Sequence, residues 1–325
     1  MAATIGGAVN LSGWVPARVV WQGDEPKIEW LLMRQQRFVE PFFEQTIDRV
    51  ARKPFHTLFR RQTSVEEMVA WTEEHPGAPL RGIILHESRC GSTLISQALA
   101  AVERNIVASE PAPLDALLRA HMQMPGLPRE TQIRWVRAMV AALGQPRNGE
   151  QAMYVKLDCW HVHQRELLRE AFPETPWIFL YREPMAVMLS HARTPAAWTI
   201  PAMLAPRALE MEMADWNPAE MEVYCARALA KICAGGLKAV REDSRGLLVN
   251  YSELPQAMWG KLTQHFGLEA RDMAAIEHQS QFDAKSPMQK FEKDGERVET
   301  ERLRAAVARY LQPVYEELEA ERLKA

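Results

Sequence analysis

The sequence has few cysteines, and they lie far apart. Four occur in 325 residues, at Cys90, Cys159, Cys225 and Cys233, and no two of them form a CxxC pair. This spacing argues against a disulfide scaffold, which needs a high density of cysteine, and against a zinc site built on paired cysteines. We therefore expect reduced thiols and a cytoplasmic protein.

The chain also lacks long apolar runs and an excess of charge of one sign. No stretch approaches the roughly 20 apolar residues that span a bilayer, and residues 1 to 12 have no basic segment of the kind that begins a secretory signal. Lys+Arg number 39 and Asp+Glu 42, which leaves a formal charge of −3. Such a balance provides no broad positive field for a polyanion. We expect no membrane span and no nucleic-acid partner.

What the chain does have is the composition of a globular protein, with 47% hydrophobic and 25% charged residues. A Pro- and Gly-rich stretch at 75–79 is its clearest break in periodic structure. It predicts an N-terminal extension, residues 1–78, that packs on a nucleotide-binding domain, residues 79–325. Within the extension, Ser64 followed by Glu67 predicts a capping box at the start of a helix.

Beyond residue 79, short apolar segments alternate with longer amphipathic ones. Strands are expected at 82–85, 105–107, 153–157, 177–181 and 246–249. Helices are expected at 92–102, 114–123, 130–143, 164–171, 185–191, 219–234, 253–266 and 301–321, the last kinked at Pro313. Alternation at this spacing predicts an α/β fold with a parallel sheet that has helices on both faces.

The first candidate site follows the strand at 82–85, in the sequence HESRCGST of residues 86–93. A strand, a tight loop and a helix in that order present free N–H groups and the positive end of the helix dipole to an anion. The predicted phosphate-binding residues of this loop are Arg89, Cys90, Gly91, Ser92 and Thr93. The triphosphatase pattern GxxxxGK[ST] is not met, because Ser92 stands where its Lys belongs. The alternative is a polar turn without a ligand.

A second candidate site follows the strand at 177–181. Arg182 lies at the carboxyl end of that strand, where open α/β sheets bind ligands. Ser190 follows eight positions later, about two helical turns into the next helix. An arginine and a hydroxyl so placed can bind one phosphate from two sides. The alternative is a salt bridge at the sheet edge and a surface serine.

Together these segments resemble the motifs of the PAPS-dependent sulfotransferase superfamily, where PAPS is 3′-phosphoadenosine 5′-phosphosulfate. The loop is similar to P-[KR]-[ST]-G-[ST]-[ST], with Ser88 and Cys90 as departures, and the second segment to R-[DN]-P-x-x-x-x-x-S, with Glu183 as a departure. Segments 155–158, 163–173, 248–254 and 266–268 resemble further parts of the family. The resemblance runs from roughly residue 80 to 320 and is weakest at 194–218.

The resemblance implies a P-loop-type sulfotransferase fold and transfer of a sulfuryl group from PAPS to a hydroxyl or amine of a small acceptor, with PAP as product and no metal. Arg89 and Lys156 would face the bridging and leaving oxygens. Many members have a His two residues after the middle-strand Lys, and here Asp158 occupies that place. Other members use a carboxylate, and Glu110 is in a similar location. We prefer Glu110 as general base over Asp158.

Other interpretations remain open at this point. Asp158 can pair with Lys156 or cap the next helix, and Glu110 can cap the helix near Leu114. Candidate acceptor-pocket residues, which are more often ordinary core, are Trp160, Trp198, Trp216 and Met203 to Met213. Candidates to close over the nucleotide are Lys285 and Lys290, which also fit a solvated loop, and no catalytic role is assigned to His86, His161, His163 or His191.

Two other functions compete with sulfuryl transfer. One is a P-loop small-molecule kinase in which Asp158 binds a metal ion. The other is a catalytically inactive, sulfotransferase-like binding protein. Neither the acceptor nor the oligomeric state follows from the sequence.

Overall fold

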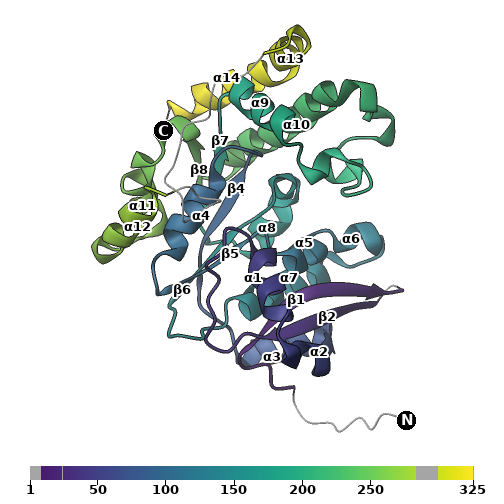
Figure 1. The fold of residues 1–325 in the computed structure, drawn as a ribbon, viewed down its shortest axis with the longest axis vertical. Coiled ribbons are helices and arrows are strands. Elements are labelled where there is room, and N and C mark those ends of the chain that lie inside the picture. The colour runs from purple at the N-terminus through teal and green to yellow at the C-terminus, as the bar shows by residue number, and fades with distance from the viewer. Residues whose placement is uncertain (1–8, 24, 283–298, 325) are drawn as a thin grey trace.

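The main domain is built on a five-stranded sheet. The computed structural model describes residues 9–23, 25–282 and 299–324 (Figure 1). The sheet has the strand order β5-β6-β4-β7-β8, and every neighbouring pair is parallel. Its strands are β4 (Leu80–His86), β5 (Asn105–Ser109), β6 (Ala152–Lys156), β7 (Trp177–Tyr181) and β8 (Gly246–Asn250).

Helices cover both faces of this sheet, because alternate strand residues point to opposite sides. Ile83, Leu85 and Phe179 pack with one group of helices, whereas Ile84 and Leu180 pack with the other. The first group contains α5 (Ala112–Leu118), α7 (Arg129–Leu143), α8 (Arg165–Ala171) and α10 (Met221–Glu242). The second contains α4 (Ser92–Ala100), α11 (Lys261–Phe266) and α12 (Met273–Gln279). The predicted α/β fold with helices on both faces is confirmed (Figure 1).

Two of the predicted helices are longer in the prediction than in the structure. The helix expected at 253–266 is wrong, because Pro255 and Gly260 interrupt it and only α11 at its end is α-helical. The segment 114–123 is divided at Arg119 into α5 and α6 (Ala120–Gln123). In contrast, α10 continues eight residues past the expected end at 234, since it ends at Glu242.

The C-terminal helix is interrupted next to Pro313, as its sequence predicts. Helix α13 (Glu301–Ala306) is followed by a π-helical turn, Val307–Leu311, and then by α14 (Gln312–Arg322). Pro313 has no N–H to donate, and the wider turn just before it accommodates the ring. The helix α9 (Pro184–Arg193) lies beside this tail in Figure 1.

The N-terminal residues form a second sheet, which the sequence did not predict. It is antiparallel, with the order β1-β2-β3 and the strands β1 (Trp14–Gln22), β2 (Glu25–Leu32) and β3 (Arg61–Ser64). The helices α1 (Phe43–Ala51) and α2 (Pro54–Leu58) connect β2 to β3, and α3 (Val65–Glu74) follows. The predicted capping box is present, since Ser64 Oγ accepts from the Glu67 N–H at 3.1 Å and Glu67 Oε2 accepts from the Ser64 N–H at 2.7 Å.

The N-terminal sheet is joined to the main domain by polar contacts as well as by apolar packing. Arg37 donates to the carbonyl oxygens of Ala100 and Val102, and Trp135 Nε1 donates to Glu66 Oε1 at 2.7 Å. Both parts contribute residues to one large apolar cluster. The boundary at residue 78 stays a prediction.

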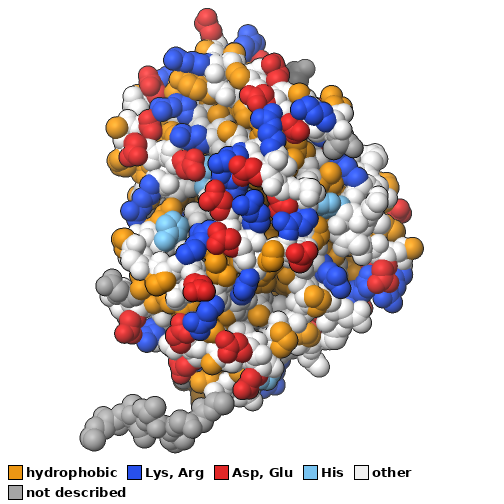
Figure 2. All heavy atoms as spheres, turned by 180° about the vertical axis from the view of Figure 1, so that it is seen from behind, with side chains coloured by type: hydrophobic (Ala, Val, Ile, Leu, Met, Phe, Trp, Pro, Cys, Tyr) orange, Lys and Arg blue, Asp and Glu red, His pale blue; other side chains and the backbone are white. Residues whose placement is uncertain are grey.

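The distribution of surface charge and the state of the cysteines match what the sequence predicts. Figure 2 shows Lys and Arg interspersed with Asp and Glu over one face of the molecule, so positive charge does not gather there. None of the helices in the described ranges is long and apolar enough to cross a membrane. All four cysteines are free thiols in the protein interior.

Candidate active site

The loop between β4 and α4, residues 87–91, has the geometry of an anion site. Gly91 is the N-cap of α4 with φ +88°, a left-handed conformation that favours glycine. The first N–H groups of a helix have no partner within the helix. The hydroxyls of Ser92 and Thr93 make no hydrogen bond within the described part of the chain. Donors are therefore available where the sequence predicts a phosphate.

Replacing Gly91 by alanine is expected to lower the free energy of unfolding by about 2–4 kcal/mol. A Cβ at this position would lie 2.7 Å from the Tyr251 ring, in addition to the backbone strain. Gly149 provides the control, because it has φ +79° and open space around its Cβ direction. Gly149→Ala should cost only the strain, about 1 kcal/mol. Equal losses in chemical denaturation would show that the contact with Tyr251 is not a close one.

Below the loop lie two buried side chains that the sequence did not mark as a pair. The Cys90 thiol is fully buried and donates to the carbonyl oxygen of Glu87 at 2.6 Å, so only the main-chain N–H of Cys90 remains for an anion. Glu87 is 1% exposed, and its Oε2 accepts from the Arg182 N–H at 3.1 Å. Burial raises the pKa of Glu87 to about 8, although that N–H and the Cys233 thiol lower it. Glu87 is thus largely neutral at pH 7 and does not repel an anion above it.

Arg182 lies against this loop, so the structure brings the two candidate motifs together. Its main-chain N–H is held by Glu87, and its guanidinium stacks 4.3 Å from the centre of the Tyr251 ring. Tyr251 also lies against Gly91 and follows β8 directly, at the same edge of the sheet. Its place directly after a strand was the signal in the sequence that could have assigned it to the site. Ser190 lies on α9 and is 9% exposed.

The departure at Glu183 has a structural explanation. Glu183 is the N-cap of α9, and its carboxylate accepts from the N–H groups of Met185 at 2.8 Å and Ala186 at 2.7 Å. Asp and Asn are the usual residues at such a cap. The longer Glu side chain satisfies the same donors, so this substitution leaves the start of α9 intact.

Arg89 holds the loop to a neighbouring helix. Its guanidinium donates to the carbonyl oxygen of Thr194, the C-cap residue of α9, at 2.7 Å. Residues 194–218 form short 3-10 turns, and Trp198 in them donates from Nε1 to Ser88 Oγ at 3.4 Å. The segment in which the family resemblance is weakest therefore packs directly on the β4–α4 loop.

Lys156 and Glu110 form an ion pair at the same edge of the sheet, in which Lys156 is buried and Glu110 is partly exposed. Lys156 ends β6, its side chain is 1% exposed, and its Nζ lies 2.5 Å from Glu110 Oε1. The Phe42 ring covers Lys156 at 4.9 Å from Nζ. Burial raises the pKa of Glu110, but Lys156 and His86 outweigh it and hold this pKa at about 2. The N-cap of α5 is Pro111, so Glu110 does not cap that helix.

Asp158 lies two residues after Lys156 in a more acidic environment. Its pKa is raised well above the usual range by burial first, and then by Glu110 and Asp115. Asp158 is the N-cap residue of a 3-10 helix, Cys159–Gln164, and its N–H donates to His161 Nδ1 at 3.1 Å. An accepting Nδ1 places the proton of His161 on Nε2, which lies 2.8 Å from Asp115 Oδ1. His161 is therefore a structural residue here, held by Asp158 and Asp115.

Three of these side chains also lie close enough together to hold a metal ion. The ligand atoms of Asp115, Asp158 and His161 are within 4.8 Å of one another. Asp115 already accepts from Arg119 Nε at 2.7 Å and from Trp160 Nε1 at 2.9 Å, besides His161. A metal ion bound to both Asp115 Oδ1 and His161 Nε2 would break the contact between these two atoms, whereas the bonds from Arg119 and Trp160 can persist around a ligating carboxylate.

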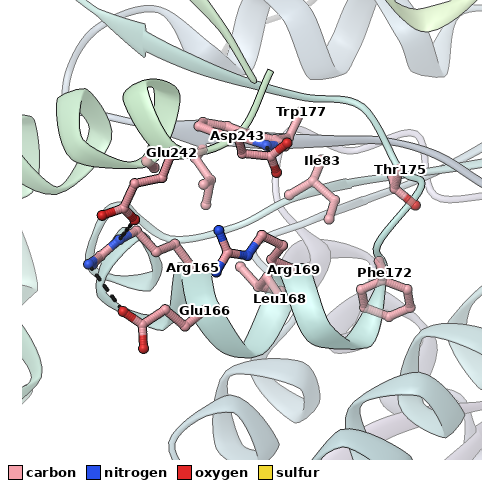
Figure 3. A pocket seen from close by; sticks show the side chains of 12 residues that line it. Ile83, Arg165, Glu166, Leu168, Arg169, Phe172, Thr175, Trp177, Glu242 and Asp243 are labelled. Atoms are coloured by element: carbon pink, nitrogen blue, oxygen red, sulfur yellow. Dashed lines mark hydrogen bonds and ion pairs between the residues drawn. The ribbon is translucent and has the colours of Figure 1, made fainter. Parts of the chain in front are cut away.

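A cavity elsewhere in the domain contains none of the predicted site residues. It measures about 30 Å³ and lies between α8, the end of α10 and the start of β7 (Figure 3). Arg165 crosses it between Glu166 and Glu242, at 3.4 and 3.9 Å. The volume suits about one water molecule. A nucleotide does not fit there.

The remaining candidates are scattered. Met211 is 1% exposed and belongs to the core, whereas Met203 and Met213 are 68% and 61% exposed, so 203–213 is not one apolar lining. Trp216 donates from Nε1 to the Thr199 carbonyl at 3.2 Å. Lys285 and Lys290 lie outside the described residues. His86, to which the sequence assigned no catalytic role, ends β4 at the ligand-binding edge, and its Nε2 lies 3.5 Å from Glu110.

Comparison with known proteins gives similarity at the level of the fold. No protein-family model and no curated protein matches the chain. Solved structures of sulfotransferases are similar to it, among them STF9 from Mycobacterium avium, with a TM-score of 0.47, 17% identity, and coverage of 76% of this chain and 81% of that one. The sulfotransferase from Alicyclobacillus acidocaldarius has a TM-score of 0.39 and 13% identity, and the match covers 75% of this chain and 95% of that one.

The sulfotransferase domain of the curacin biosynthetic pathway gives a TM-score of 0.39 at 16% identity, covering 65% of this chain and 81% of that domain. All three structures are described as sulfotransferases or a sulfotransferase domain, the family whose motifs residues 86–93 and 182–190 resemble. At these values the likeness assigns no substrate and no residue role.

Proposed function

We propose that this protein transfers a sulfuryl group from PAPS to a hydroxyl or amine of a small-molecule acceptor and releases PAP. The observation that carries the proposal is the convergence of the β4–α4 loop with Arg182 at one sheet edge. In the proposal, Arg182 and Ser190 bind the 3′-phosphate. The main-chain N–H groups of residues 88–93, with the hydroxyls of Ser92 and Thr93, bind the 5′-phosphosulfate. The buried free cysteines favour a reducing compartment such as the cytoplasm.

The reaction needs a base on one side of the sulfur and a cation on the other. A bond forms between the acceptor oxygen or nitrogen and sulfur, the bond from sulfur to the bridging oxygen breaks, and the acceptor proton passes to a carboxylate. Sulfuryl transfer resembles phosphoryl transfer in relying on positioning and charge stabilisation. Lys156 stabilises the charge that develops on the leaving phosphate.

Glu110 is the proposed base. Its side chain is 24% exposed, against 15% for Asp158, and it is held ionised by Lys156. When Lys156 turns to the leaving oxygen, Glu110 loses its counter-ion and becomes a stronger base. Arg89 is proposed to hold the loop through the Thr194 carbonyl and to add positive charge beside it.

One observation favours the kinase alternative. A P-loop kinase needs a carboxylate for Mg²⁺ after the middle strand, and Asp158 lies there with Asp115 close by. The contact between Asp115 and His161, which a metal ion bound to both would break, weighs against it. Metal dependence separates the two functions.

Calorimetric titration with PAP tests the proposal, with ADP and with ATP plus Mg²⁺ as comparators. We expect metal-independent binding of PAP that exceeds binding of ADP. Arg182→Ala should weaken PAP binding roughly 10- to 100-fold, because a charge-assisted contact contributes about 1.5–3 kcal/mol. Arg271→Ala is the control, since Arg271 is 65% exposed and pairs with Glu269. Preference for ATP with Mg²⁺ over PAP would replace the proposal with the kinase.

A further inference from the structure

The surface around α2 differs in charge from the rest of the chain. Residues 49–65 contain five Lys or Arg and no Asp or Glu, whereas the whole chain has a formal charge of −3. Arg52, Lys53 and Arg60 are exposed, and none of them forms an ion pair with any residue that the structure describes. We call residues 52–60 the α2 tip. Its cations are uncompensated, in contrast to the mixed charges of Figure 2.

The α2 tip also exposes large apolar side chains in the middle of these cations. Phe55, Leu58 and Phe59 are 39%, 76% and 58% exposed. Phe55 and Leu58 are three residues apart and therefore lie on one side of the helix. Phe59 is the C-cap residue, and its ring lies 5.0 Å from that of Phe55. His56 points the other way and is buried. The exposed side is thus an apolar apex that the fold does not cover within the described residues.

Shape and chemistry together indicate the partner. The tip is a short helix at the margin of the molecule, beside the N-terminal sheet (Figure 1). Aromatic and leucine side chains surrounded by Lys and Arg favour the interface of an anionic membrane, where the rings enter the headgroup layer and the cations meet lipid phosphate and carboxylate. A nucleic-acid backbone offers phosphates to the cations but would leave Leu58 exposed to water. A partner protein with an acidic groove would leave the same apolar side chains exposed.

We propose that the α2 tip docks this protein peripherally on membranes rich in anionic lipid. The proposal does not depend on sulfuryl transfer. The helix α1 connects Phe42, which covers Lys156, to the tip, and its nine residues span about 14 Å. Docking would therefore hold the candidate active site near the lipid headgroups.

Vesicle flotation of the full-length protein tests the proposal. We expect binding to vesicles of phosphatidylcholine with phosphatidylserine, little binding to phosphatidylcholine alone, and weaker binding at high salt. The triple variant R52Q/K53Q/R60Q should bind about fivefold more weakly for each cation removed. L58S/F59S should bind roughly tenfold more weakly, because apolar area no longer leaves water.

Two matched controls separate the tip from the general surface. L323S changes a leucine that is 74% exposed, against 76% for Leu58, and K238Q removes a cation that is 56% exposed. Neither should alter vesicle binding. Absence of binding to anionic vesicles would overturn the proposal. Binding that the triple variant loses but L58S/F59S retains would also overturn it, because the partner would then be any soluble polyanion, such as polyphosphate.

Discussion

Lys156→Met is expected to lower the free energy of unfolding by about 3 kcal/mol and to abolish turnover. The substitution keeps most of the side-chain volume but leaves Glu110 without its counter-ion, in a position where burial alone raises the pKa of the carboxyl. The folded-state pKa of about 2 lies below the ordinary value of 4.5, so the pair stabilises the wild type above about pH 4.5 and loses this contribution as the pH falls towards 2. Denaturant unfolding of the wild type and the variant at neutral and acidic pH measures the loss of stability and its pH dependence.

The double variant K156M/E110Q separates stability from catalysis. Removing both charges leaves no buried ion, so most of the lost stability should return, whereas activity should not. If Lys156→Met costs no stability at neutral pH, or if the double variant is no more stable than the single one, Lys156 and Glu110 are not paired as the structure has them.

Glu110→Gln should lower kcat by about 10²- to 10⁴-fold, because Glu110 is the proposed general base. Glu110 and Asp158, as alternative bases, also predict different pH profiles. A general base must be ionised. With the pKa of Glu110 at about 2 in the free protein, kcat/KM should show no acid limb between about pH 5 and 8 from this residue. The pKa of Asp158 is raised instead, so a base at Asp158 would place the acid limb of the profile at higher pH than Glu110 would. Initial rates across this range, once an acceptor is found, make the measurement.

Asp158→Asn is the matched comparison for Glu110→Gln, because both replace a carboxylate by its amide. A carboxyl whose folded pKa is raised contributes most stability below its unfolded pKa and loses this contribution as the pH rises through the folded pKa. Asp158→Asn should therefore stabilise the fold at neutral pH and leave most of kcat intact. A collapse of kcat in Asp158→Asn with an active Glu110→Gln would assign the base to Asp158.

Part of the fold was predictable because local patterns and tertiary packing agree. The strand at 177–181 and the helix that begins at Ser92 appear where the sequence places them, since buried parallel strands are short apolar runs between turn residues. The N-terminal sheet was not predicted. Its strands carry mixed burial, and β3 pairs with β2 only after α1 and α2 have intervened. Pairing of β3 with β2 across such a distance leaves no local period in the sequence, whereas β1 and β2 are close in sequence and pair as a hairpin from Gln22 and Glu25 onward.

The candidate site was also predictable in part. Residues at the carboxyl ends of strands, such as Arg182, Lys156 and Glu110, could be gathered from the sequence because parallel strands end at one edge. The sequence could not predict which carboxylate pairs with Lys156, because Glu110 and Asp158 both lie near that edge. In the structure Glu110 has φ +56°, and its side chain forms the ion pair with the lysine. Phe42 and Tyr251 reach the site from distant segments.

The sequence by itself determined the alternation of strands and helices, the glycine turn before α4 and the order of the two phosphate motifs, because each depends on a few neighbouring residues. Tertiary structure alone decided that Arg89 would bind the end of α9, that Glu87 would join the two motifs, and that the apolar side of α2 would remain uncovered. These outcomes depend on which surfaces meet across the chain, and that is set by packing of the whole domain.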